Sequence, residues 1–168
     1  MYKWIIAIGI LLLTGSLHGE APPCSWFEKT TGNLQGELAK AKQSGKKGVL
    51  VMFELNGCGE CQKVKETLLK EPSVQRYYQA HFHNISLFVD NLGPLTDFTG
   101  KPTTQSEFAN ANRVIAAPTF IFYDIDGYPV TRFTGAARDT DEFITLGRYV
   151  AEAAYETMPF GAYRQTAQ

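Results

Sequence analysis

Two cysteines separated by two residues are the side chains in this sequence best suited to chemistry. They lie in the stretch Cys58-Gly59-Glu60-Cys61. A pair at this spacing can close a disulfide with little movement of the backbone, and it can exchange that disulfide with another thiol. Exchange requires a reactive thiolate and a second thiol that resolves the mixed disulfide. The spacing therefore predicts a redox couple.

The segments on either side of the pair would place it where a strand turns into a helix. Residues 47–53 are apolar and β-branched, which predicts a buried strand. Residues 62–70 are rich in Lys, Glu, Val and Leu, which predicts a helix. A helix N-terminus presents unpaired amides and a partial positive charge, and both favour a thiolate over a thiol. The expected position thus supports the same chemistry.

The composition is that of a globular protein. A chain of 168 residues with 44% hydrophobic residues can bury a substantial core in one domain. The net charge is −1 and the basic residues are scattered, so we expect no nucleic-acid partner. We expect a monomer whose domain spans residues 33–157, with a tether at residues 20–32 and a tail at residues 158–168.

The first 19 residues have the pattern of a secretory signal peptide. Lys3 precedes an uninterrupted apolar run over residues 4–13, and small residues follow as far as Gly19. The run is shorter than the roughly 20 apolar residues that a transmembrane helix needs. We expect cleavage after Gly19 and export, with an uncleaved membrane anchor as the alternative. Cys24 would then be an unpaired thiol near the new N-terminus, with an intermolecular role as the alternative.

Half of a zinc site and a structural disulfide are the alternative uses of the cysteine pair. Tetrahedral zinc would need two further ligands, and the candidates after signal cleavage are His81, His83 and Cys24. The two histidines flank the start of a predicted strand, where a surface role is favoured. Gln62, rather than His, follows the second cysteine, so covalent haem attachment is not indicated. We expect a redox couple with no metal and no cofactor.

The rest of the chain alternates between helical and extended patterns. Helices are predicted over residues 33–43, 73–81, 106–113 and 140–155, and strands over residues 83–89, 119–123 and 128–133. Ser73 is the expected cap of the second of these helices. Residues 90–104 contain two Gly/Pro clusters, which predicts a long loop or insertion. The alternation predicts a mixed sheet covered on both faces, with two parallel strands and a terminal antiparallel hairpin.

This arrangement resembles the thioredoxin fold, because the Cys-x-x-Cys pair is followed by Ala117-Pro118-Thr119 just before a later strand. The resemblance implies an α/β thioredoxin fold: a central mixed sheet flanked by helices, with the insertion before the helix that precedes the cis-proline strand. It implies that Pro118 is cis and lies against the disulfide. It also implies that Cys58 is the exposed nucleophile and Cys61 the buried resolving thiol.

The same resemblance suggests where a partner would bind. Ala117 and Thr119 would flank Pro118 in the groove that receives the partner's backbone. Gly59 and Glu60, which separate the cysteines, are further candidate contacts. The negative charge of Glu60 should oppose thiolate formation at Cys58 and move the couple toward the reducing side.

Two positions depart from ordinary thioredoxins. Gly57 stands where those proteins usually carry Trp, and apolar Met52 stands where they carry a buried Asp. Glu54 is the nearest acidic residue, and it could accept or relay the proton of Cys61 if it is buried. The alternative is a partly exposed carboxylate at the end of a strand.

Several short motifs resemble exported thioredoxin-like proteins of the SoxW subgroup, which is linked to bacterial sulfur oxidation. They include Phe53-Glu54, Asp97-Phe98 with Gly100, Glu107-Phe108-Ala109, Phe122-Tyr123-Asp124 and Glu142-Phe143. The resemblance implies a periplasmic reductant that acts on exported proteins bearing disulfides or thiols and is recharged by a membrane thiol donor. Gly59-Glu60 departs from the pairs usual in that subgroup. A disulfide oxidase or isomerase, and a non-catalytic module that binds peptide or metal, are the alternatives.

Overall fold

The computed structural model describes residues 26–28 and 30–166. The expected signal peptide, its cleavage point and Cys24 lie outside these residues. The helices are α1 (Leu34–Gln43), α2 (Gly59–Thr67), α3 (Pro72–His81), α4 (Gln105–Ala111), α5 (Thr140–Ala151) and α6 (Phe160–Thr166), with a 3-10 turn η1 (Ala154–Glu156). The strands are β1 (Val49–Glu54), β2 (His83–Phe88), β3 (Pro94–Thr96), β4 (Pro102–Thr104), β5 (Thr119–Tyr123) and β6 (Pro129–Thr134).

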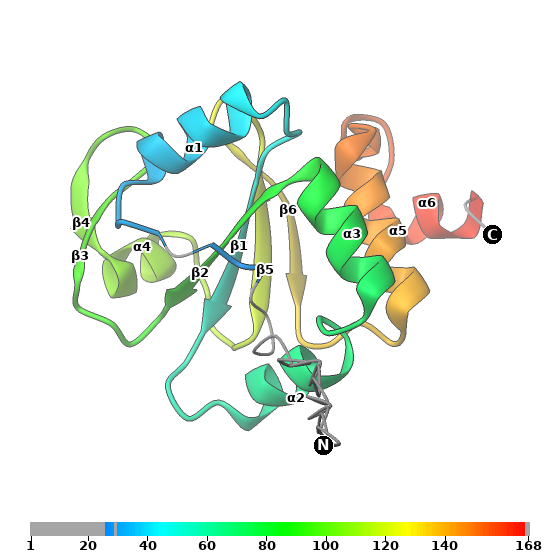
Figure 1. Cartoon of the computed structure of the whole chain (residues 1–168), viewed down its shortest axis with the longest axis horizontal. Coiled ribbons are helices and arrows are strands. Elements are labelled where there is room, and N and C mark those ends of the chain that lie inside the picture. Colours follow the sequence, from blue (N-terminus) through cyan, green and yellow to red (C-terminus); the bar gives the residue numbers. More distant parts are fainter. Residues whose placement is uncertain (1–25, 29, 167–168) are drawn as a thin grey trace, which may run out of the picture.

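A four-stranded sheet in the order β2-β1-β5-β6 forms the centre of the molecule (Figure 1). β1 and β2 run parallel, whereas β5 is antiparallel to both β1 and β6. The expected mixed sheet with its parallel pair and terminal hairpin is therefore confirmed.

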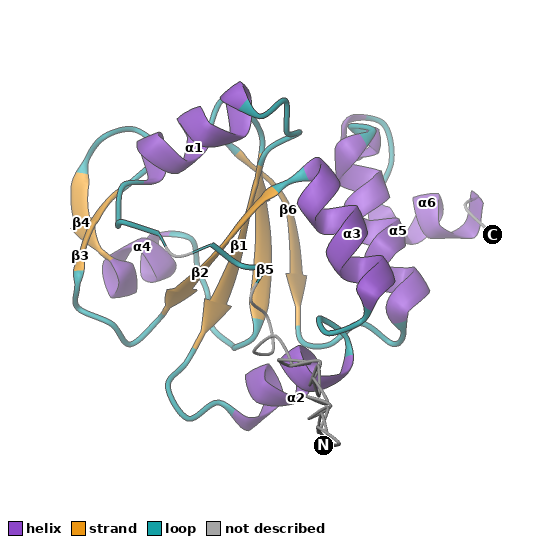
Figure 2. Ribbon diagram, viewed as in Figure 1, coloured by secondary structure: helices purple, strands orange, loops and turns teal. Residues whose placement is uncertain are grey.

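The sheet separates two apolar clusters, because successive side chains of a strand point to opposite faces. Every residue of β1 is buried. Leu50 and Met52 pack with α2, α3 and α5 on one face, and Val51 and Phe53 pack with α1 and α4 on the other (Figure 2). Full burial of each such side chain stabilises the fold by about 1.5–3 kcal/mol. α2 lies beyond the C-terminal end of β1, so the sheet brings the cysteine segment to one rim (Figure 1).

Helix α3 begins one residue before Ser73, the residue expected to cap it. Its first residue is Pro72, and Glu71 precedes it without a capping side-chain hydrogen bond. Proline suits this position because its fixed φ is helical and its missing amide would have no partner there. The prediction that Ser73 caps the helix is wrong, since Ser73 lies inside it.

The segment over residues 90–104, expected to be a long loop or insertion, contains two paired strands. Its strands β3 and β4 pair as an antiparallel hairpin next to α1 and α4 (Figure 1). Thr104 ends the hairpin and also caps α4: its side chain accepts from the Glu107 amide while Glu107 accepts from the Thr104 amide. This reciprocal capping box joins the insertion firmly to the helix that follows.

The core extends beyond residues 33–157 at both ends. Trp26 is only 5% exposed, and its indole nitrogen donates to the carbonyl of Leu69 over 2.9 Å. Tyr163 of α6 is buried in the same cluster, and its hydroxyl donates to Glu152 over 2.6 Å. The segments expected to be tether and tail thus contribute core side chains. Among the residues that the structure describes, no helix is long and apolar enough to span a membrane.

Candidate functional site

A disulfide joins Cys58 and Cys61 at the start of α2, with 5.2 Å between their α-carbons. The helix begins at Gly59, three residues before the expected start, because Cys58 caps it. The Cys58 sulfur accepts from the Cys61 amide over 3.0 Å. The sulfur that would carry the thiolate therefore faces an amide donor and the positive end of the helix, and both stabilise negative charge.

The two sulfurs differ in access. Cys58 is half-buried, whereas Cys61 is only 2% exposed and belongs to the apolar cluster beneath α2. A partner can reach Cys58 but not Cys61. Gly59 and Glu60, between them, are exposed and lie at the surface that a partner would meet.

A tight turn presents the first cysteine to solvent. Gly57 has φ of +73°, a left-handed conformation that glycine adopts without strain. The Cys58 amide then donates back to the Leu55 carbonyl over 3.1 Å. Asp90, which follows the end of β2, holds Asn56 in place: the side-chain amide of Asn56 donates to the Asp90 carboxylate over 3.0 Å. Glycine at position 57 is thus explained by the backbone of the turn.

The loop before β5 lies against the disulfide. The Ala117–Pro118 peptide bond is cis, and the Ala117 carbonyl oxygen lies 3.7 Å from the Cys58 sulfur. Thr119 is buried, and its hydroxyl donates to the Ala116 carbonyl over 2.8 Å. Of the two residues expected to flank the groove, Ala117 therefore lies at the disulfide. Thr119 is instead buried, and its hydrogen bond stabilises the loop.

An apolar hollow adjoins this loop. It has a volume of about 130 Å³, and its lining residues are Leu55, Val89, Val114, Ile115, Ala116 and Ala117. Ile115 is 96% exposed, which is unusual for a branched aliphatic side chain. Ala117 borders both the hollow and the Cys58 sulfur. A polypeptide at the disulfide would therefore meet apolar surface on this side.

Glu54 lies beneath the cysteine helix. It is only 4% exposed, so the alternative of a partly exposed strand-end carboxylate is wrong. Lys65 of α2 forms an ion pair with one carboxylate oxygen, and the Ser86 hydroxyl donates to the other. Glu54 and Lys65 line the same cavity as Cys58 and Cys61, which has a volume of about 380 Å³. The structure thus brings a buried ion pair to the redox centre.

Lys65 and Ser86 were not identified from the sequence. Lys65 follows Cys61 by four residues, a spacing that places both side chains on one face of a helix. That signal is available in the sequence, but the strand residue that Lys65 would meet is not. Ser86 is paired with Met52 in the parallel ladder, and only that register shows that it lies beside Glu54.

The histidines considered as zinc ligands are held elsewhere. His81 forms a hydrogen bond with the Tyr77 carbonyl over 2.8 Å. His83 is buried between Glu37, at 2.7 Å, and Glu28, at 3.2 Å. It pairs with Val49 at the opposite end of β1 from Glu54, so the sheet separates it from the cysteines. Among residues 26–28 and 30–166, no group of three His, Cys, Asp or Glu side chains is arranged to hold a metal.

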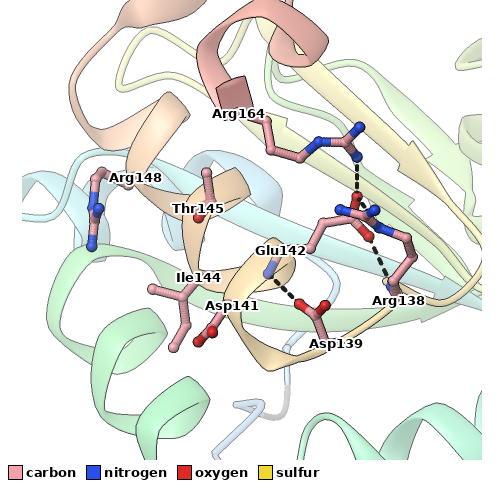
Figure 3. Close-up of a pocket in the computed structure, with 8 residues that line it drawn as sticks. All are labelled: Arg138, Asp139, Asp141, Glu142, Ile144, Thr145, Arg148 and Arg164. Atoms are coloured by element: carbon pink, nitrogen blue, oxygen red, sulfur yellow. Dashed lines mark hydrogen bonds and ion pairs between the residues drawn. The ribbon is translucent and has the colours of Figure 1, made fainter. Parts of the chain in front are cut away.

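A larger cavity of about 490 Å³ lies at the start of α5, and its lining carries no cysteine (Figure 3). Glu142 is buried there, paired with Arg164 and, at 3.2 Å, with Arg138. Burial alone would raise the pKa of this carboxyl, but bonds from the Arg138 amide and both guanidinium groups outweigh burial and lower the pKa. These ion pairs join the start of α5 to α6.

Comparisons with known proteins agree on the fold. The family model described as "Thioredoxin-like domain" matches residues 34–151. A thioredoxin from Thermus thermophilus is 31% identical, with a TM-score of 0.54 over 68% of this chain and 81% of its own. A thioredoxin-fold protein from Helicobacter pylori is 18% identical, with a TM-score of 0.63 over 73% and 84%. The DsbH oxidoreductase is 15% identical, with a TM-score of 0.59 over 82% and 94%.

No curated protein matches the sequence. The family match nevertheless includes all four strands of the central sheet and both cysteines. The two structures under 25% identity agree with it at the level of the fold alone. Since the family model covers well over half of the chain, this protein belongs to the thioredoxin-like domain family.

Proposed function

We propose that this protein is an exported thiol–disulfide oxidoreductase that reduces disulfides in partner proteins. The disulfide between an accessible Cys58 and a buried Cys61 at a helix N-terminus is the observation that carries the proposal. Family membership and the CxxC disulfide support the general class of reaction. The reducing direction, the partners and the location are the proposed refinements.

The reaction would proceed in two exchanges from the dithiol form. The Cys58 thiolate attacks one sulfur of the partner disulfide; the other partner sulfur leaves as a thiolate and takes up a proton. Cys61 then loses its proton and attacks the Cys58 sulfur, which breaks the mixed disulfide and releases the second partner thiolate. The partner gains a dithiol and the protein keeps the Cys58–Cys61 disulfide. A donor dithiol must return the two electrons.

The apolar hollow would receive the partner next to its disulfide. Ala117 lines the hollow and also contacts the Cys58 sulfur. Ile115 lines it too, and burying this exposed side chain against a partner would be favourable. Burying one aliphatic side chain is worth about 1.5–3 kcal/mol. Asn56 and Glu60, which precede and follow Cys58 in the chain, are exposed polar residues that a partner would also meet.

The reducing direction, export and sulfur oxidation rest on the sequence. Glu60 places negative charge between the cysteines, which disfavours the thiolate and makes the dithiol a better reductant. Residues 1–19 have the pattern of a signal peptide, so the working location is the bacterial periplasm, with membrane anchoring as the alternative. In that oxidising compartment a membrane thiol donor would be needed. The SoxW-like motifs suggest partners in sulfur oxidation.

The equilibrium reduction potential of the couple tests the direction. We would measure it in the full chain carrying Cys24→Ser, against glutathione or dithiothreitol. A value near about −270 mV would support a reductant, whereas a value near about −120 mV would identify a strong oxidant. A pair that exchanges with neither reagent would contradict the reaction class itself.

A further inference from the structure

Two hollows adjoin the redox couple, and exchange with partner proteins has been assigned to only one of them. The apolar hollow borders Cys58 through Ala117. The second is the cavity of about 380 Å³ whose lining includes both cysteines. Leu55 is the residue that the two linings share. The larger cavity is therefore a separate approach to the Cys58 sulfur.

The size of this cavity suits a small molecule. Ligand sites in proteins measure about 300–1,000 Å³, and this one lies near the lower end of that range. Glycines leave space next to Cys58, since a Cβ at Gly57 or Gly59 would meet no atom within 4 Å. Both glycines line the cavity. A small ligand inside it would therefore lie beside the half-buried Cys58 sulfur.

Polar side chains line the cavity next to the sulfurs. Glu54 and Lys65 form an ion pair there, so their opposite charges offset each other. The side-chain amides of Asn56 and Gln62 are exposed and also belong to the lining. Lys63, the other lysine of α2, is not among the lining residues. The lining is thus suited to a polar ligand and adds no net charge of its own.

Three exposed carboxylates lie around this lining, and we call them the acidic rim: Glu60, Glu66 and Asp90. Asp90 accepts from the Asn56 amide over 3.0 Å, and Glu66 accepts from the Gln62 amide over 2.6 Å. Glu60 lies between the two cysteines. Because the ion pair in the lining is neutral overall, the acidic rim makes the surroundings of the cavity negative. A negative cleft attracts cations.

We propose that this cavity binds a small disulfide carrying ammonium groups, such as the dimer of an aminothiol, and that the couple reduces it as a second substrate beside partner proteins. The ammonium groups of the ligand would face the acidic rim, and its disulfide would lie beside Cys58. This inference names a substrate class for the proposed exchange function and therefore rests on it. The cavity and the apolar hollow would select different substrates for one pair of sulfurs.

The reaction uses the same two exchanges. The Cys58 thiolate attacks one sulfur of the small disulfide, and the other sulfur leaves as an aminothiol thiolate that takes up a proton. Cys61 then loses its proton and attacks the Cys58 sulfur, which releases the second aminothiol. The ligand is reduced to two thiols and the Cys58–Cys61 disulfide forms. A donor dithiol must again return the two electrons.

Three small disulfides of similar length but different charge test the site. Cystamine is a dication, hydroxyethyl disulfide is neutral and dithiodipropionate is a dianion. Each would oxidise the reduced full chain carrying Cys24→Ser, with the loss of protein thiols as the measurement. Dividing each rate by that of the same disulfide with dithiothreitol removes differences between leaving groups. We expect the normalised rate for cystamine to exceed that for dithiodipropionate by about tenfold, the scale of a few exposed charge pairs, and this ratio to fall with added salt.

Neutralising part of the acidic rim should reduce the preference. In Asp90→Asn/Glu66→Gln each side chain keeps an oxygen that can accept from its amide partner, so the lining is preserved. We expect the ratio of cystamine to dithiodipropionate to fall to about threefold or less. The matched control Asp126→Asn/Glu156→Gln removes two exposed carboxylates elsewhere on the surface, and it should keep the parent ratio.

Filling the cavity distinguishes it from the apolar hollow. We expect Gln62→Trp to slow the reduction of cystamine about tenfold more than the reduction of an unfolded protein disulfide, because a small misplacement of a reacting group costs at least this much in rate. Lys63→Trp, exposed on the same helix but outside the lining, is the control. Ile115→Asp, which alters the apolar hollow, should show the opposite selectivity.

Equal normalised rates for the three small disulfides would overturn the inference. So would a control double variant that loses the preference equally, or a Gln62→Trp variant that slows both kinds of substrate to the same extent. Each of these results leaves the exchange function intact, since the parent still reduces disulfides. A parent whose thiols react with none of the small disulfides and with no protein disulfide would instead contradict the proposed function.

Discussion

Cys58 serves the structure and the chemistry with the same sulfur atom. It caps α2 through the Cys61 amide, and it is the half-buried member of the redox couple. The cap holds the sulfur at the positive end of the helix, so the reactive thiol is fixed before any partner arrives. Its role should differ from that of Cys61 in a simple trapping experiment.

We expect Cys61→Ser to accumulate mixed disulfides with partner proteins and Cys58→Ser to accumulate none. Without Cys61 nothing resolves the bond formed at Cys58, whereas without Cys58 the remaining thiol is buried. Non-reducing electrophoresis after incubation with an unfolded disulfide protein measures the adduct, in chains carrying Cys24→Ser. Equal trapping by both variants would contradict the assignment of Cys58 as the nucleophile.

Gly57 should be sensitive to substitution because of its backbone conformation. A Cβ at this position would meet no atom within 4 Å, yet φ is +73°. We expect Gly57→Ala to lower the free energy of unfolding by about 1–2 kcal/mol, the usual cost of a left-handed conformation. Gly59→Ala is the matched control, since that position is equally open but has no positive φ. Urea unfolding of the oxidised proteins would reveal the difference, and equal losses would contradict it.

Among the elements, the loop before β5 should govern partner binding. We expect Ile115→Asp to slow the reduction of a protein disulfide by about tenfold or more, because a charge would enter surface that the partner covers. Reduction of a small aliphatic disulfide should be unchanged. Ile125→Asp is the control, as Ile125 is also exposed but lies outside the hollow. Equal effects of the two substitutions would show that the hollow is not the binding surface.

The ion pairs of Glu142 join the start of α5 to α6. The pKa of this carboxyl is lowered in the fold, so its contribution to stability is present above its ordinary value of 4.5 and is lost as pH falls through the folded pKa. We expect Glu142→Gln to be less stable than the parent at neutral pH, and the difference to shrink as pH falls below 4.5. Thermal unfolding across this range measures it, with exposed Glu156→Gln as the control. A constant difference would contradict the assignment.

The strong local patterns in the sequence were sufficient to predict most of the helices and strands. β5 has the predicted bounds, and α1 begins within one residue of its prediction. The hairpin of β3 and β4 was missed because each strand has only three residues and begins with Pro, so neither shows a periodic pattern. The ion pair of Glu54 and Lys65 was missed for a related reason. It depends on how α2 packs over the end of β1, which neither segment encodes alone.

At the scale of the whole molecule, Trp26 ties the N-terminal segment to the core. We expect Trp26→Ala to lower the free energy of unfolding by about 3–5 kcal/mol, the typical cost of truncating a buried Trp or Phe. Tyr128→Ala, at an exposed position, should cost under about 0.5 kcal/mol. Chemical unfolding of the two variants makes the comparison. A small loss at Trp26 would mean that the segment is dispensable for the fold.

The segment that carries Trp26 also protects the sheet. β2 is an edge strand of the four-stranded sheet, and Glu28 forms a parallel bridge with Ile85, its amide donating to the Asn84 carbonyl over 2.8 Å. Unpaired sheet edges recruit strands from other chains and so promote aggregation. Processing that leaves residues 26–28 in place keeps this edge partly blocked, whereas a cut beyond them would expose it. Residues 26–28 therefore limit how far the N-terminus can be shortened before the edge of β2 is exposed.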